Sequence, residues 1–195
     1  MSLMNPSAEA AARRLHSPLR ARALAEPALQ GTVILSILVS LTQYPRSQHG
    51  SVTQQIQGTS ITVSYNRPVA RGRELFGTLV RWGRIWHPGA DSVSTISFST
   101  KVTIDGHELA AGRYSLWTIP AEPPAPWTVI FNRGLGGWHT NYPGESQDAL
   151  RLKVTTETGP HMETLTYYFP MVDADSALLR LQWGTTIVPL HIHVP

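Results

Sequence analysis

The sequence predicts an all-β protein, an antiparallel β-sandwich of jelly-roll-like or barrel-like form with about nine strands. Fifteen glycines, fifteen prolines and only 15% charged residues favour a chain with many turns over a helical one. From Gly50 onward apolar and polar residues alternate with a period of two, which places alternate side chains on opposite faces of a sheet. We therefore expect a leader at residues 1–50 and one sandwich domain at residues 51–195.

The first half of the domain contains four predicted strands. Ile61–Tyr65 and Val93–Phe98 alternate cleanly and should each bury one face. Lys101–Ile104 runs into Asp105-Gly106, a dipeptide that tolerates the positive φ angles of a two-residue hairpin turn. Arg113–Ile119 is apolar on both faces, which is typical of a central strand.

The second half begins with a surface connection, because four prolines between Pro120 and Pro126 cannot form a regular ladder. The remaining predicted strands are Trp127–Phe131, Leu150–Val154, Leu165–Phe169, Leu179–Trp183 and Val188–Val194. Gly184 is expected to turn the chain between the last two strands.

Two loops stand out as candidate sites. The stretch from Ser60 to Thr100 holds five arginines, two tryptophans, four glycines and two prolines, most of them in the loop 66–91. The loop Asn132–Glu145 is rich in glycine and aromatic residues. Loops longer than about 12 residues inside a compact domain are usually functional or mobile.

The leader has the pattern of a secretory signal. Arg13, Arg14, Arg20 and Arg22 precede an uncharged run whose apolar segment spans residues 28–43. A spanning helix needs about 20 apolar residues. No Ala-x-Ala cleavage site follows, so an uncleaved membrane anchor is one alternative and a buried element of the domain is another. We expect an exported protein, periplasmic or secreted, that contacts a membrane only through this segment.

The charge distribution argues against a nucleic-acid partner. Residues 1–50 hold five arginines against Glu9 and Glu26, a net charge of +3. Residues 51–195 hold eleven basic and eleven acidic residues, a net charge of zero. The domain thus lacks the basic surface that a phosphate backbone requires. The absence of cysteine excludes disulfides and thiolate metal sites.

Arginines and aromatic residues form the main candidate binding site. Arg67, Arg71 and Arg73, with Arg81 and Arg84, could bind an anion through guanidinium forks, or could satisfy loop carbonyls and pair with Glu74 and Asp91. Aromatic side chains that could stack on a sugar or another flat ligand, or else close the core, are Trp82, Trp86, Trp138 and Tyr142.

Histidines supply two further candidates. His87 with Asp91 in one loop could perform acid–base catalysis, although no Gly-x-Ser-x-Gly elbow marks a nucleophile. His191 and His193 share one strand face and could bind a metal if another strand supplied a third ligand; otherwise they face solvent. Residues Gly134–Gly137 lack the Lys-Ser/Thr ending of a phosphate loop, and we expect no cofactor.

A set of short motifs resembles a known family. The motifs are Tyr65-Asn-Arg-Pro68, Arg71-Gly-Arg73, Phe76-Gly77, Gly83-x-x-Trp86-x-x-Gly-Ala90, Ala111-Gly-x-Tyr-Ser115, Ile119-Pro120, Trp127-Thr-Val-Ile130 and Trp183. In order and spacing, over residues 52–190, they resemble the bacterial family catalogued as domain of unknown function 2911. The resemblance implies an exported β-sandwich protein with an N-terminal signal, and implies no activity. The family motif at this place is Trp-Arg-x-Gly-Ala-Asn. In this chain the corresponding residues are Trp86–Asp91, with His87 in place of the arginine and Asp91 in place of the asparagine.

Three functional hypotheses are compatible with the sequence. The favoured one is a non-catalytic envelope protein that binds a small molecule, glycan or protein through the loops 66–91 and 132–145. The second is a hydrolase or isomerase that uses His87 with Asp91 and the loop arginines. The third is a structural subunit whose exposed sheet edge pairs with a partner. The oligomeric state is left open by the sequence.

Overall fold

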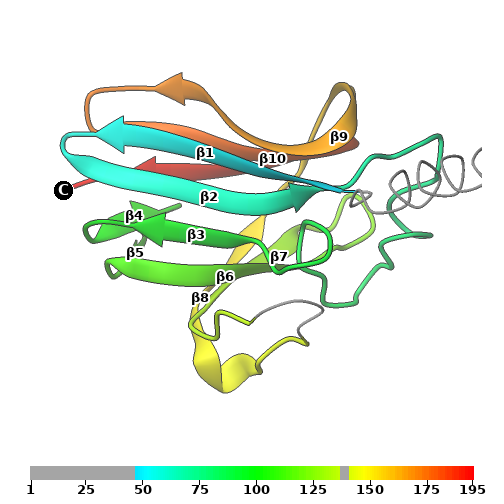
Figure 1. Cartoon of the computed structure of the whole chain (residues 1–195), viewed down its shortest axis with the longest axis horizontal. Coiled ribbons are helices and arrows are strands. Elements are labelled where there is room, and N and C mark those ends of the chain that lie inside the picture. Colours follow the sequence, from blue (N-terminus) through cyan, green and yellow to red (C-terminus); the bar gives the residue numbers. More distant parts are fainter. Residues whose placement is uncertain (1–46, 137–140) are drawn as a thin grey trace, which may run out of the picture. The chain divides into compact units, whose positions relative to one another are not determined.

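The computed structural model describes residues 47–136 and 141–195. The predicted leader, apart from residues 47–50, lies outside the described residues, as do Trp138 and His139. Within the described residues the chain forms ten β-strands and no α-helix (Figure 1). The strands are β1 (Gln48–Ile56), β2 (Thr59–Arg67), β3 (Thr95–Phe98), β4 (Val102–Ile104), β5 (His107–Leu109), β6 (Gly112–Ile119), β7 (Trp127–Asn132), β8 (Asp148–Val154), β9 (Glu157–Val172) and β10 (Ser176–His193).

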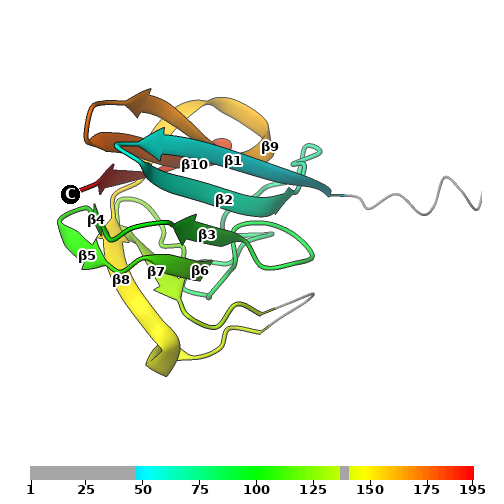
Figure 2. The ribbon, with the colours of Figure 1, turned by 60° about the vertical axis from the view of Figure 1, so that its left-hand side comes forward.

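The strands form two antiparallel sheets. The six-stranded sheet has the order β1-β2-β3-β6-β7-β8, and the four-stranded sheet has the order β5-β4-β10-β9. The sheets face each other across one hydrophobic core and remain open, which makes the fold a sandwich and not a closed barrel (Figures 1 and 2). The predicted fold class is confirmed.

The alternating pattern explains which faces are buried. In β2 the side chains of Ile61, Val63 and Tyr65 are buried, while those of the residues between them are only partly covered. Asp105 and Gly106 have φ angles of 46° and 84°, and they join β4 to β5 as the predicted hairpin turn. Burial of apolar area of this kind contributes about 25 cal/mol per Å².

The prediction of a turn at Gly184 was wrong. Residues Ser176–His193 form one strand of 18 residues, and Gly184, with φ of 58°, lies inside it where the register with β9 shifts. A glycine with positive φ can form a bulge without ending the ladder, so the glycine marks an irregularity and not a strand end. The predicted strands Leu179–Trp183 and Val188–Val194 are therefore both part of β10, which reduces the nine predicted strands to eight. Two strands that were not predicted, β1 and β5, bring the total among the described residues to ten.

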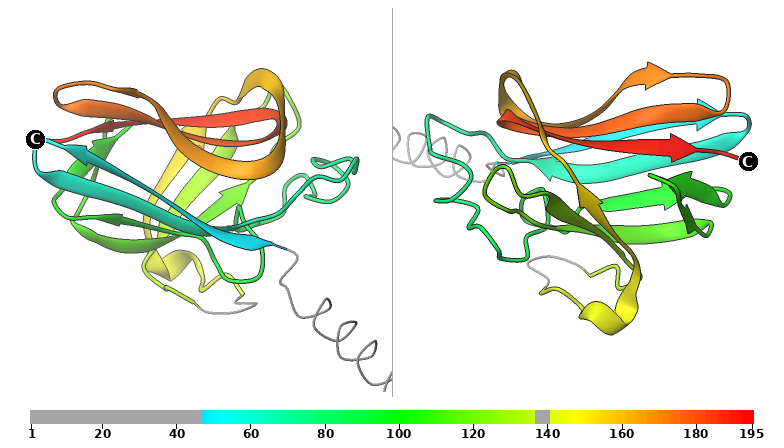
Figure 3. Two further views of the ribbon diagram at one scale, coloured as in Figure 1. Left: turned by 45° about the horizontal axis from the view of Figure 1, so that its top comes forward. Right: turned by 180° about the vertical axis from the view of Figure 1, so that it is seen from behind.

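The chain between β2 and β3 forms the end of the sandwich opposite the C-terminus in every view (Figure 3). This segment, residues 68–94, contains most of the predicted loop 66–91, whose first two residues belong to β2. In the described ranges no helix is long and apolar enough to cross a membrane.

Candidate functional site

Residues 68–94 are tied to both sheets by backbone hydrogen bonds. Near its start, Ala70 N donates to Glu163 O and Leu165 N donates to Pro68 O, which extends the ladder of β9. Near its end, Trp86 and Thr118 exchange both backbone hydrogen bonds, at 2.8 and 2.7 Å, beside β6. Because both ends are paired with strands, the segment is held in a fixed position relative to the core.

Phe76 anchors the middle of this segment. It contacts the rings of Trp82, Trp86, Trp127 and Trp183, with centroid separations of 6.1, 6.1, 4.9 and 6.3 Å. Trp82 also contacts Trp127, which is buried in the core. Trp82 therefore packs against the end of the core and takes the alternative role that the sequence allowed for it.

A cleft of about 340 Å³ opens beside this aromatic cluster. Its lining residues are Ser47, Pro68, Val69, Arg71, Arg73, Leu79, Val80, Trp86, Gly89, Ala90 and Trp183. Trp86 and Trp183 are stacked, with centroids 6.1 Å apart and an angle of 20° between the ring planes. We call this feature the Arg–Trp cleft; three of the predicted ligand-binding residues line it.

The two arginines of the Arg–Trp cleft are held differently. Arg73 donates from Nε to Ala70 O at 2.9 Å and from a terminal nitrogen to Val69 O at 2.6 Å. Its guanidinium therefore satisfies loop carbonyls, as one of the sequence alternatives proposed. Arg71 is anchored through its backbone N–H, which donates to Glu163 Oε1, and its exposed side chain forms no ion pair within the described residues.

The remaining arginines lie outside this lining. Arg67 is half-buried and its side chain lies against Gly50 of β1. Arg81 and Arg84 are exposed. The expected pairing with acidic residues is absent among the described residues: Glu74 accepts a hydrogen bond from Thr78 Oγ1, and neither Glu74 nor Asp91 forms an ion pair with an arginine.

His87 and Tyr142 bring the two candidate loops together. Both rings lie edge-on against Trp117 of β6, with centroid separations of 5.6 Å and 5.4 Å. Loops 66–91 and 132–145 therefore reach the same tryptophan, although neither His87 nor Tyr142 lines the Arg–Trp cleft. Asp91, the predicted partner of His87, is half-buried and has a positive φ of 59°.

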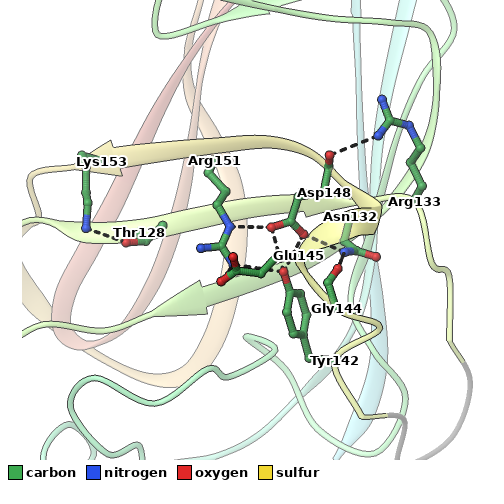
Figure 4. Close-up of polar contacts among 9 residues, drawn as sticks. All are labelled: Thr128, Asn132, Arg133, Tyr142, Gly144, Glu145, Asp148, Arg151 and Lys153. Atoms are coloured by element: carbon green, nitrogen blue, oxygen red, sulfur yellow. Dashed lines mark hydrogen bonds and ion pairs between the residues drawn. The ribbon is translucent and has the colours of Figure 1, made fainter.

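A polar network holds the second loop (Figure 4). Tyr142 donates its hydroxyl to Asp148, and Arg151 contacts Asp148 through Nε and the Tyr142 hydroxyl through a terminal nitrogen. The buried Asn132 donates from Nδ2 to Asp148 Oδ1 at 2.7 Å and to Gly144 O at 3.0 Å. Desolvation and the hydrogen bond to Asp148 raise the pKa of Tyr142, while the contacts with Asp148 and Tyr142 raise the pKa of Arg151. The network fixes Tyr142 and Gly144 beside β7 and β8, and the Asp148 carboxylate accepts hydrogen bonds from three side chains, those of Tyr142, Asn132 and Arg151.

The two candidate metal ligands lie far along the last strand. His191 and His193 are exposed, and His191 Nδ1 lies 3.0 Å from Asp105 Oδ1. The described part of the chain contains no group of three or more histidine, cysteine or acidic residues that could hold a metal ion.

Comparison with known proteins agrees with the motif pattern. A family model described as "Protein of unknown function (DUF2911)" matches residues 47–192. The chain belongs to the DUF2911 family. No curated protein and no solved structure matches it.

The DUF2911 motifs map onto the parts that build the Arg–Trp cleft. Arg71 and Arg73 line it, Phe76 supports it, and Trp86 and Trp183 form its aromatic wall. His87, where the resemblance predicts an arginine, lies beside Trp117 instead. The His87 side chain therefore does not line the cleft in this DUF2911 member.

Sequence reasoning missed the roles of two groups of residues in this DUF2911 domain. Trp183 entered as a residue of the predicted strand Leu179–Trp183 and of a family motif but not as a site residue, because its contact with Trp86 joins positions 97 residues apart. Arg151 looked like an ordinary polar position of the predicted strand Leu150–Val154, and Asp148 lay outside that strand and was not singled out, yet the side chain of Asp148 is only 8% exposed. The sequence signal that could have identified this pair is the spacing of Asp148 and Arg151, a carboxylate and a guanidinium three residues apart next to an aromatic loop.

Proposed function

We propose that this protein is a non-catalytic binding module for a small organic anion with a flat apolar part. The observation that carries the proposal is the Arg–Trp cleft, where two arginines and two stacked tryptophans line one space of about 340 Å³. That volume falls at the lower end of the range, about 300–1,000 Å³, of small-molecule pockets.

The lining divides into a charged part and an apolar part. Arg71 can present a guanidinium fork, which binds carboxylates through paired hydrogen bonds, while Arg73, whose Nε and one terminal nitrogen donate to loop carbonyls, contributes positive charge. Trp86, Trp183, Leu79 and Val80 present apolar surface for the body of a ligand. Because the described lining contains no carboxylate or imidazole, it suits recognition of an anion better than acid–base chemistry.

Arg71 is the residue best placed to contribute ligand affinity. Its side chain forms no ion pair within the described residues, but its charge acts on the nearby Glu163, whose pKa is lowered first by the hydrogen bond with His161 and also by Arg71, so a ligand anion shares this charge with the Glu163 carboxylate. Arg73 supports the loop as well, because it donates to two loop carbonyls. Loss of Arg71 should therefore affect binding with little effect on folding, whereas loss of Arg73 should affect both.

The test is calorimetric titration of the full chain with 2-naphthoate and with its neutral amide. We expect saturable binding of the acid, weaker binding of the amide, and a loss of about tenfold in affinity for Arg71→Gln, as for one charge-assisted hydrogen bond. Arg84→Gln is the matched control, because Arg84 is an exposed arginine of the same loop outside the cleft. Equal affinity for acid and amide, or equal losses in the two variants, would contradict an anion site. Binding of neutral oligosaccharides alone would instead support a glycan ligand.

We also propose that the protein is exported. The basic residues Arg13–Arg22 and the apolar segment 28–43 support this, and so does the neutral charge of residues 51–195. Fractionation of cells that produce a C-terminally tagged chain, followed by N-terminal sequencing, tests it. A periplasmic or secreted product with a new N-terminus after residue 43 is expected, an intact membrane-bound product indicates an uncleaved anchor, and an intact cytoplasmic product refutes export.

A further inference from the structure

A second cleft, of about 180 Å³, lies on the outer face of the six-stranded sheet. Its lining residues are His49, Ser64, Tyr65, Asn66, Ser92, Val93, Thr95 and Arg113. None of them lines the Arg–Trp cleft. The second cleft therefore needs an explanation of its own, independent of the function proposed for the Arg–Trp cleft.

The register of three strand pairs gathers the polar residues of this cleft on one face. His49 of β1 lies opposite Asn66 of β2, and Ser64 of β2 lies opposite Thr95 of β3. Arg113 of β6 lies opposite Ser97, two residues from Thr95 and thus on the same face. Directly paired residues share a face, so four adjacent strands present five hydrogen-bonding side chains to one side.

The chemistry of this group favours an anion. Arg113 donates from a terminal nitrogen to Thr95 Oγ1 at 3.2 Å, which directs its guanidinium along the sheet, and it forms no ion pair with any described residue. Ser64 Oγ lies 3.4 Å from His49 Nε2. The lining offers guanidinium, imidazole, hydroxyl and amide groups and contains no carboxylate, so it suits an oxyanion better than a hard cation. Asn66 Nδ2 already donates to Ala90 O at 3.0 Å, so the main donors left for an anion are those of Arg113, Ser64, Thr95 and His49.

From this arrangement we propose that the cleft formed by His49, Ser64, Asn66, Thr95 and Arg113 is a binding site for a small oxyanion of the phosphate type. Its volume of about 180 Å³ is below the range of about 300–1,000 Å³ that drug-sized ligands occupy. It can therefore hold an ion or the anionic head of a larger molecule. Arg113 supplies the charge, and the side chains of Ser64, Thr95 and His49 supply further donors.

The test is titration of the full chain with inorganic phosphate, sulfate and acetate, followed by two-dimensional amide NMR. Saturable shifts are expected at β1, β2, β3 and β6, around the backbone N–H groups of Ser64 and Thr95. Arg113→Gln should weaken phosphate binding by about tenfold or more, because it removes a charge-assisted donor pair. Arg113 is exposed, so this substitution should leave the fold intact, which the unchanged remainder of the spectrum would show.

Two controls decide the location. Arg84→Gln removes one exposed positive charge elsewhere and should leave the phosphate affinity within about twofold, as expected for a distant surface charge. Arg71→Gln removes a charge from the Arg–Trp cleft and should likewise have little effect. The proposal is overturned if phosphate, sulfate and acetate give no saturable shifts at these strands, or if Arg71→Gln and not Arg113→Gln abolishes binding. Preference for phosphate or sulfate over acetate would identify the tetrahedral ion as the ligand, and preference for acetate would overturn the phosphate type.

Discussion

Ser94 and Tyr167 donate hydrogen bonds to the same atom, the carbonyl oxygen of Pro88, at 2.7 and 3.1 Å. Ser94 precedes β3 in the six-stranded sheet and Tyr167 belongs to β9 in the four-stranded sheet. All three residues are buried. One loop carbonyl therefore connects the two sheets at the base of the segment that carries the Arg–Trp cleft.

The shared acceptor predicts strong coupling between two substitutions. Ser94→Ala and Tyr167→Phe should each lower the free energy of unfolding by about 1–2 kcal/mol, because each leaves the Pro88 carbonyl with one donor. The double variant leaves a buried carbonyl without a donor, so its loss should exceed the sum of the single losses by about 1 kcal/mol. Urea unfolding of the four proteins measures this, and simple additivity would show that the two bonds act independently.

Two tyrosines with raised pKa values predict a loss of stability at alkaline pH. Burial, and next the neighbouring Tyr65, raise the pKa of Tyr167 well above 10.0, and desolvation raises the pKa of Tyr142 as well. Above pH 10 the unfolded chain releases these protons while the folded chain keeps them, so stability present below pH 10 is lost as the pH rises. Unfolding measured between pH 8 and pH 11 should show the decline. Tyr167→Phe should flatten it more than Tyr142→Phe, because Tyr167 is fully buried; an equal slope in all three proteins would contradict this.

Phe76 should support both the core and the cleft. Phe76→Leu is expected to cost about 1 kcal/mol and Phe76→Ala about 3 kcal/mol of unfolding free energy, because the ring contacts four tryptophans. Tryptophan emission should shift to longer wavelength in the alanine variant as water reaches Trp82 and Trp86. Leu79→Ala is a suitable comparison, because Leu79 is an apolar residue of the same loop that is 45% exposed and should cost much less.

Much of the fold was readable from the sequence because local rules determined it. Alternation identified the strand at Ile61–Tyr65, and Asp105-Gly106 identified the β4–β5 turn. Those rules failed at Gly184, where the same residue type that forms turns forms a bulge inside β10. β1 went unrecognised because only Ile56 of its nine residues is buried, so it lacks a strong apolar pattern.

The site was less readable because it depends on distant contacts. The composition of residues 66–91 predicted that arginines and tryptophans would lie together, and Arg71, Arg73 and Trp86 do line one cleft. No local pattern could show that Trp183 lines this cleft or that His87 and Tyr142 lie outside it. Those positions depend on how the strands pair across the sandwich.

Gly89 should be intolerant of a side chain. A methyl group there would collide with the Ser94 hydroxyl oxygen, and the backbone oxygen of Asn66 would lie at 3.4 Å. Gly89→Ala is therefore expected to cost about 2–3 kcal/mol of unfolding free energy by overpacking. Gly83→Ala, where φ is +67° and nothing lies within 4 Å, should cost about 1 kcal/mol through backbone strain alone. Combining Gly89→Ala with Ser94→Ala should recover part of the loss, and a failure to recover any would show that the collision is not with that hydroxyl.

Trp117 should couple the two loops, because His87 and Tyr142 both pack on its ring. Trp117 is 3% exposed, and its Nε1 donates to Ser115 Oγ, which in turn donates to Gly134 O at 2.6 Å. Trp117→Leu removes the ring and that donor, so both loops lose a support. Amide hydrogen exchange should then accelerate by about tenfold or more at Trp86 N, which is bonded to Thr118 O, and at Arg133 N, which is bonded to Gln147 O.

The matched comparison is Trp82→Leu, which removes a tryptophan of the first loop that packs on Phe76 of that loop and on Trp127 of β7. Exchange should then accelerate near Trp86 and stay unchanged at Arg133. Acceleration at both amides in both variants would reflect a general loss of stability instead of local coupling. Acceleration at neither amide in Trp117→Leu would show that the hydrogen bonds of Trp86 with Thr118 and the Tyr142–Asp148–Arg151 network each hold their loop without the ring.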